Sequence, residues 1–244
     1  MRILLTNDDG IGAEGLKALA TTLSRGHDVC VFAPDTERSG ISHALTLGAA
    51  CKVRRVEERV FICSGTPSDC VILTLLGAID FEPEIVVSGI NRGPNLGTDI
   101  LYSGTCAAAR EAVLSGIPGI AVSCASRGEP LHYGAAVTFV LKNIEALAEA
   151  CSGHAFVNIN APSADDDSSG AVWSFPCTRV YNNKLKSFDG PDGFSYFFLT
   201  GGDSGIRGEG ASDFGVVGAG KISVSPILVH PQVPAHFLSG REFR

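Results

Sequence analysis

The chain has 244 residues, of which 45% are hydrophobic, and its formal net charge is −7 at pH 7. This length suits one α/β core with a smaller appendage. The acidic balance, without a long basic run, argues against a nucleic-acid polymer as partner. The sequence has no apolar run of about 18 to 20 residues that would span a membrane, and its N-terminus lacks a signal-peptide pattern. A cytoplasmic location is therefore expected.

Strand-like and helix-like segments alternate through the first 162 residues. Apolar runs predict strands at 2–6, 28–34, 84–89, 119–124 and 156–162, with a hairpin at 51–63. Helical spacing predicts helices at 12–26, 66–79, 105–116 and 133–153. Continuous apolar strands between helices are typical of a parallel sheet covered on both faces. We therefore predict a Rossmann-like core over residues 1–162, with a mostly parallel sheet.

The pattern changes after residue 162. Residues 163–170 ("SADDDSSG") read as a loop, and residues 171–244 carry short β-like runs, many glycines and little helical periodicity. Such a segment is too small to bury a core of its own. Residues 163–244 are therefore expected to form a β-rich extension that packs on the core or on a neighbouring subunit.

Eight cysteines are scattered along the chain. They form no CxxC pair and no Cys/His cluster, so no zinc site is predicted. Several lie in apolar strand-like contexts, and we expect reduced, mostly buried thiols.

Two adjacent carboxylates, Asp8 and Asp9, follow the first predicted strand in "LLTNDDG". An Asp-Gly turn in solvent is one interpretation, and a cation site is the other. In open parallel sheets, ligands bind beyond the carboxyl ends of the strands. The loops after the strands at 28–34 and 84–89 meet at that edge and bring Ser39 and Asn91. Two carboxylates with neutral oxygens suit one divalent ion, magnesium or manganese.

The loop after the strand at 84–89 has four glycines and ends at Ser103, Gly104 and Thr105, where a helix begins. It is either an ordinary surface loop or one whose backbone approaches a ligand. Unpaired N–H groups and the helix dipole favour a phosphate at that end. Asn91 and Asn95 are further candidates for substrate contact, although Asn95, like Asp99, could instead orient the loop.

Competing motifs are absent or misplaced. The sequence has no GxxxxGK[ST] P-loop, and no GxGxxG follows the first strand. The serine of "GDSGIRG" does not follow a long strand and enter a helix, as a nucleophile elbow requires. A metal on one side and a helix N-terminus on the other are typical of phosphoryl transfer.

Several long motifs in order resemble the survival protein E (SurE) family of metal-dependent nucleotidases. They are "ILLTNDDGIGAEGL", "FAPDTERSGISHALT", "GTPSDCV", "VVSGINRGPNLGTDILYSGTCAAAREA" and "VNINAP", and "ASDFGVVGAGKISVSPI" resembles the family's tail more loosely. The resemblance implies a 5′-nucleotidase that hydrolyses nucleoside monophosphates, with 3′-nucleotides and short polyphosphate as further candidate substrates. It also implies Asp8, Asp9, Ser39 and Asn91 as metal ligands, and a homodimer or homotetramer whose C-terminal segments extend or swap.

Three alternatives stay open at this point. The nucleophile is either a metal-bound water or the Asp8 carboxylate. His43 could act as a general acid, or it could make only structural hydrogen bonds. A sensor that holds a metal–nucleotide complex without turnover would use the same aspartates, and so would a glycosyltransferase that holds a metal–diphosphate.

Overall fold

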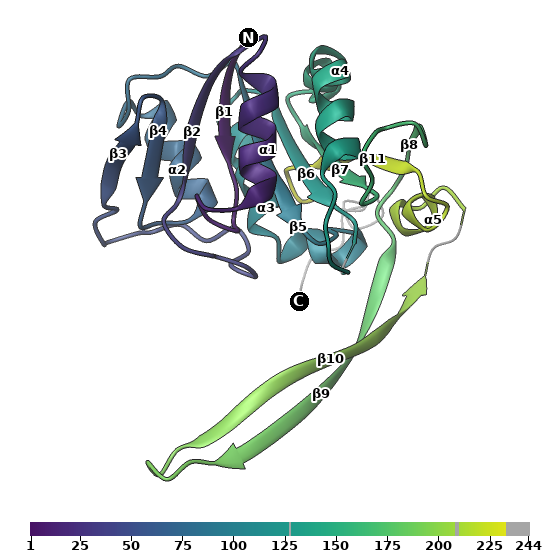
Figure 1. The fold of residues 1–244 in the computed structure, drawn as a ribbon. Helices are drawn as coiled ribbons and strands as arrows, with labels where there is room; N and C mark the ends of the chain where they lie inside the picture. Colours follow the sequence, from purple (N-terminus) through teal and green to yellow (C-terminus); the bar gives the residue numbers. More distant parts are fainter. Residues whose placement is uncertain (127, 208–209, 233–244) are drawn as a thin grey trace, which may run out of the picture.

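One nine-stranded sheet organises the computed structural model, which describes residues 1–126, 128–207 and 210–232 (Figure 1). The strand order is β3-β4-β2-β1-β5-β6-β7-β11-β8. In chain order the strands of this sheet are β1 (Arg2–Thr6), β2 (Asp28–Pro34), β3 (Val53–Glu57), β4 (Val60–Cys63), β5 (Ile85–Arg92), β6 (Gly119–Cys124), β7 (Ala155–Ala161), β8 (Ala171–Trp173) and β11 (Ile222–Leu228).

Neighbouring strands from β4 to β7 run parallel, whereas β3 is antiparallel to β4 and β11 is antiparallel to β7. Residues 3–5 and 85–87, in the central strands, are completely buried. Burial on both faces is the reason that these strands read as continuous apolar runs. The predicted Rossmann-like fold with a mostly parallel sheet is confirmed.

Helices cover both faces of the sheet. They are α1 (Glu14–Leu23), α2 (Pro67–Leu75), α3 (Gly104–Leu114) and α4 (Gly134–Ala150). Leu19 of α1 and Val140 of α4 share one apolar cluster, while Val71 of α2 and Ala108 of α3 share another on the opposite face. Within the described residues, no helix combines the length and the apolar character needed to cross a bilayer.

The C-terminal part differs from the expectation of short strands without helix. Strands β9 (Thr178–Asp189) and β10 (Ser195–Arg207) have 12 and 13 residues and form a separate antiparallel ribbon that projects from the body (Figure 1). A short helix, α5 (Asp213–Gly218), precedes β11. Its glycines hide the helical pattern in the sequence, but Ser212 caps its first turn by accepting a hydrogen bond from the Gly215 N–H at 3.2 Å. Strands β8 and β11 extend the main sheet.

Helix α2 begins as the sequence predicts, with Thr66 as N-cap and Pro67 in the first turn. Asp69 completes a capping box, since its carboxylate accepts the Thr66 N–H at 2.8 Å. The same carboxylate accepts the Thr46 N–H at 3.0 Å and the Thr46 hydroxyl at 2.6 Å. Asp69 therefore joins α2 to the loop that follows β2.

We expect Asp69→Asn to lower the free energy of unfolding by about 2 kcal/mol at pH 7, the scale of a lost cap and charged hydrogen bonds. Burial alone raises the pKa of Asp69, but hydrogen bonds from Thr46 and Thr66 outweigh it and lower that pKa. The stabilisation is therefore complete above the unfolded-state pKa of about 3.9 and is lost as the pH falls through the lower folded value.

Denaturant titrations of wild type and variant at several pH values test this expectation. The difference in stability should shrink below about pH 4. Asp80→Asn, at an exposed position, is the matched control and should change little. A difference that stays constant down to pH 3, or an equal effect of the control, would contradict it.

Candidate active site

Three loops at the carboxyl ends of β1, β2 and β5 meet at one cavity of about 560 Å³. These strands are neighbours in the sheet, so the loops that leave them are adjacent. Five of the predicted site residues line this cavity: Asp8, Ser39, Asn91, Asn95 and Ser103. Asn91 lies within β5, which continues beyond the predicted strand end at residue 89.

Asp8 is 3% exposed and is held by the first turn of α3. Its Oδ2 accepts the Gly104 N–H at 3.1 Å, and its Oδ1 accepts the Thr105 hydroxyl at 2.5 Å. Gly104 permits this approach, because a Cβ there would lie 2.8 Å from the Cβ of Asp8. Burial raises the pKa of Asp8, although the hydrogen bond from Thr105 opposes that shift. The positive end of the α3 dipole helps to stabilise the charged form.

Asp9 accepts the Arg92 N–H at 3.0 Å through Oδ2. Burial first, and then the charge of Asp8, raise the pKa of Asp9 to about 6. Asp9 lines a neighbouring cavity of about 370 Å³, which also contains Glu37 and Glu129, and Arg92 lines both cavities. The two aspartates therefore lie at the junction of two cavities.

The loop that carries Ser39 is attached to the end of β1 and to the segment that follows β4. The Arg38 N–H donates to the Asp8 carbonyl at 2.7 Å, and the Arg38 side chain donates to the Ser64 carbonyl at 2.8 Å. Ser39 donates to Glu37 at 2.7 Å, which leaves its hydroxyl oxygen as a ligand atom. The amide nitrogen of Asn91 donates to the Gly93 carbonyl at 2.9 Å, so its amide oxygen is the atom left for a ligand.

This donor set fits a hard divalent cation. Two carboxylates, a hydroxyl and an amide oxygen are the ligands that magnesium and manganese prefer. Burial raises the pKa of both carboxylates, and the charge of Asp8 raises the pKa of Asp9 further. A cation at Asp8 and Asp9 would relieve that electrostatic cost.

Ser103, Gly104 and Thr105 form the N-terminus of α3, as predicted, but two of them contact Asp8. The hydroxyl of Thr105, which is fully buried, and the Gly104 N–H both donate to that carboxylate. The Ser103 hydroxyl accepts the Cys106 N–H at 3.1 Å as the N-cap, and Ser103 lines the cavity. The contacts of Thr105 suit the positioning of Asp8, and its assignment to phosphate binding stays a prediction.

His43 is not among the residues that line either cavity. Its Nε2 lies 2.8 Å from Oε2 of Glu111, on α3, and both side chains are largely buried. These contacts agree with the structural role that the sequence also allowed.

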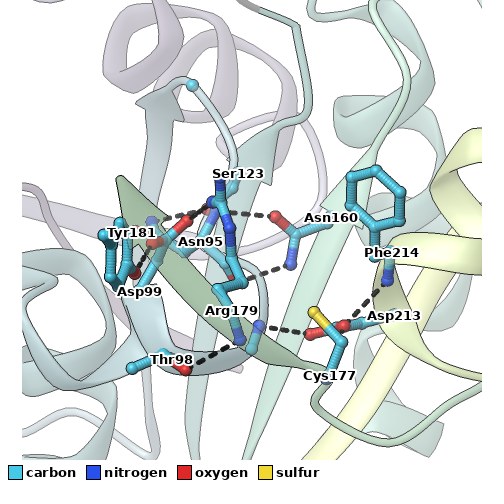
Figure 2. Close-up of polar contacts among 12 residues, drawn as sticks. Asn95, Thr98, Asp99, Ser123, Asn160, Cys177, Arg179, Tyr181, Asp213 and Phe214 are labelled. Atoms are coloured by element: carbon cyan, nitrogen blue, oxygen red, sulfur yellow. Dashed lines mark hydrogen bonds and ion pairs between the residues drawn. The ribbon is translucent and has the colours of Figure 1, made fainter. Parts of the chain in front are cut away.

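A buried amide network fixes Asn95 (Figure 2). The Asn95 N–H donates to Asn160 at 2.8 Å, its side-chain amide donates to Ser123 at 2.8 Å, and its carbonyl accepts the side-chain amides of Asn158 and Asn160 at 2.9 and 3.0 Å. Asn158 and Asn160 alternate in β7 with apolar Val157 and Ile159, so both asparagines face α3 and the glycine-rich loop. Sequence reasoning assigned them no role, although polar residues with a period of two in a buried strand were the available signal.

The base of the ribbon also reaches the site. Asp99, in the 3₁₀ helix η1 (Gly97–Leu101), pairs with the Arg179 guanidinium and accepts the Tyr181 hydroxyl (Figure 2). Asp213 of α5 accepts the Gly97 N–H at 2.6 Å and the Cys177 N–H at 2.9 Å. Sequence reasoning named Asp99 as a residue that could orient the loop, and it missed Arg179, Tyr181 and Asp213. Their partners lie between 36 and 116 residues away along the chain.

Comparison with known proteins agrees with this architecture. A family model described as "Survival protein SurE" matches residues 3–187. The chain is 42% identical over 229 residues to the 5′-nucleotidase SurE of Geotalea uraniireducens (strain Rf4), covering 93% of this chain and 92% of that protein. It is 39% identical over 243 residues to the 5′-nucleotidase SurE of Parasynechococcus marenigrum (strain WH8102), with coverage of 93% and 91%.

A solved structure shows the same fold. The crystal structure of the SurE protein from Aquifex aeolicus superposes with a TM-score of 0.82 at 30% sequence identity, over 98% of this chain and 97% of that one. The family match covers most of the chain, and the curated relatives are similar over almost their whole length. The chain therefore belongs to the SurE family.

Proposed function

We propose that this chain is a metal-dependent 5′-nucleotidase that hydrolyses nucleoside monophosphates to nucleoside and phosphate. The observation that carries this proposal is the buried Asp8 carboxylate, held by the N-terminus of α3 at a cavity that also contains Ser39 and Asn91. Relatives named 5′-nucleotidase SurE, similar over almost their whole length, support the same activity.

Asp8, Asp9, Ser39 and Asn91 would hold one magnesium or manganese ion per subunit. When bound, such an ion supplies positive charge to phosphate oxygens and lowers the pKa of a coordinated water. Gly104 and Thr105 keep the Asp8 carboxylate oriented. The N-terminus of α3, with Ser103 on the cavity wall, supplies a favourable potential for the substrate phosphate.

Water is the better-supported nucleophile. Both oxygens of Asp8 already accept hydrogen bonds from α3, which suits a ligand more than an attacking carboxylate. Asn95 lines the cavity and is fixed by the amide network around it, so it is suited to orient the substrate or the loop. A metal–nucleotide sensor without turnover is less well supported, because the relatives are named as enzymes.

We further propose that the chain works as a homodimer or homotetramer built partly through the ribbon. Phe188 stacks on Tyr196 at 5.0 Å and on Phe198 at 5.8 Å, yet all three rings are more than a third exposed. Exposed aromatic side chains concentrated on a projecting ribbon are typical of an interface between chains.

Chelation should abolish phosphate release from adenosine 5′-monophosphate, and magnesium or manganese should restore it. Asp8→Asn and Asp9→Asn should each remove most of the activity, because each removes a charged ligand. Ser39→Ala should reduce activity less, since water can replace a neutral oxygen. Phosphate release is measured alongside circular dichroism, which checks that each variant folds. Full activity of a metal-free preparation in excess chelator would refute the metal assignment.

Thr105→Val should weaken metal affinity about 10- to 100-fold, the scale seen when a residue that orients a metal ligand is lost. Thr105→Ser keeps the hydroxyl and should restore affinity. Calorimetric titration with manganese measures both variants. The matched control is Thr74→Val. It also removes a buried hydroxyl, but that hydroxyl donates a hydrogen bond within α2. If Thr105→Val instead leaves metal affinity unchanged and weakens inhibition by orthophosphate, Thr105 belongs to the phosphate site.

Phe198→Glu should lower the oligomeric state, because it places a charge within the stacked aromatic cluster. Light scattering at micromolar concentration measures the mass. Ser187→Glu adds the same charge to the ribbon without removing an aromatic ring and should leave the assembly intact. A wild-type protein that is a stable monomer at this concentration would contradict the proposed assembly.

A further inference from the structure

The lining of the 560 Å³ cavity combines two chemistries. One set consists of polar groups from the loops after β1, β2 and β5, including Asp8 and Ser39. The other set consists of Tyr102, which follows η1, Tyr181 from the base of the ribbon, and Leu199, which pairs with Leu185 farther along the ribbon. These three side chains are 57%, 37% and 74% exposed. With the proposed cation at Asp8, a ligand that fits this cavity has an anionic part and a flat or apolar part.

The two tyrosines form an aromatic corner. Their ring centroids are 6.4 Å apart and their planes meet at 78°, so the edge of one ring faces the other. This arrangement leaves ring faces available for a planar group. Tyrosine is well suited to such a role because its ring stacks on any base while its hydroxyl is anchored elsewhere.

Asp99 anchors that hydroxyl. It accepts a hydrogen bond from Tyr181 and pairs with Arg179, whose backbone N–H also donates to the Thr98 hydroxyl at 3.1 Å (Figure 2). The side chains of Asp99 and Arg179 are only 18% and 9% exposed, so this pair is shielded from solvent. Side chains held by hydrogen bonds and a shielded ion pair keep one geometry better than exposed ones do.

The backbone beneath this pair is equally constrained. Gly97 begins η1 with φ +53°, and a Cβ added there would lie 2.1 Å from the Cys177 carbonyl oxygen. The ribbon therefore begins in direct contact with η1, and Asp213 bonds to both segments. Asp99 connects the same two segments at the level of the cavity.

We propose that Asp99 is a positioning residue for nucleoside recognition, because it fixes the Tyr181 ring as the cavity wall on which the base of a nucleoside monophosphate packs. This inference rests on the proposed nucleotidase function and names the part of the substrate that the ribbon recognises. The phosphate then lies toward Asp8 and Ser103, and the base lies toward Tyr102 and Tyr181.

Adenosine 5′-monophosphate and ribose 5-phosphate form a matched pair of substrates, since they share the phosphorylated sugar and differ in the base. The measured quantity is the ratio of their kcat/KM values in magnesium buffer. A base stacked on an aromatic ring contributes about 1–3 kcal/mol, which is about a 5- to 140-fold change. Tyr181→Ala should lower the ratio within that range, chiefly through KM for the nucleotide.

Asp99→Asn should lower the same ratio about tenfold, because the ring remains but loses its anchor. Tyr181→Phe removes only the hydroxyl, and its ratio should lie between those of wild type and Tyr181→Ala. Asp192→Asn is the matched control, since Asp192 accepts the Tyr196 hydroxyl at the far end of the ribbon. The control should keep the wild-type ratio.

Calorimetric titration with adenosine 5′-monophosphate in excess chelator gives a readout that does not depend on turnover, because the proposed hydrolysis requires the metal. Weaker binding to Asp99→Asn and Tyr181→Ala, but not to Asp192→Asn, supports the inference. Equal losses for both substrates, or an unchanged ratio in both variants, would overturn it. If wild type releases no phosphate from either substrate, the proposed function is wrong, and the titration alone tests the inference about Asp99. If wild type then also binds no nucleotide, the inference is overturned too.

Discussion

The site depends on one interaction, the capture of the Asp8 carboxylate by the first turn of α3. A buried carboxylate is costly, and here two donors from α3 and the end of its dipole compensate for that cost. The same contact fixes α3 relative to β1, because Gly104 has no Cβ to hold them apart. The proposed cation and phosphate sites, and the shape of the cavity beside them, depend on this arrangement.

The sequence predicted the sheet well because its signals are local. Apolar runs, glycine stops and the Thr66 cap each act within a few residues, and the predicted strands and helices occur within a few residues of their expected ends. The carboxyl-end rule predicted that Ser39 and Asn91 lie beside Asp8 and Asp9; Asp8, Ser39 and Asn91 share one cavity, and Asp9 lines the neighbouring one. Their roles as ligands stay predictions.

Contacts between distant segments could not be predicted in the same way. Nothing near Thr105 indicates that its hydroxyl donates to a residue 97 positions earlier, and Asp99 and Tyr181 are 82 positions apart. Helix α5 was missed because its glycines lower helix propensity, whereas Ser212 and the contacts of Asp213 stabilise it. The ribbon was underestimated because β9 exposes side chains on both faces, which removes the usual alternation.

Manganese substitution with anomalous diffraction tests the central claim most directly, because it locates the metal without relying on activity. Crystals of the full chain grown with manganese should show one anomalous peak per subunit, coordinated by Asp8, Asp9, Ser39 and Asn91. The Thr105 hydroxyl and the Gly104 N–H should keep their bonds to Asp8. A peak elsewhere, or no peak at these four residues in saturating manganese, would contradict the account.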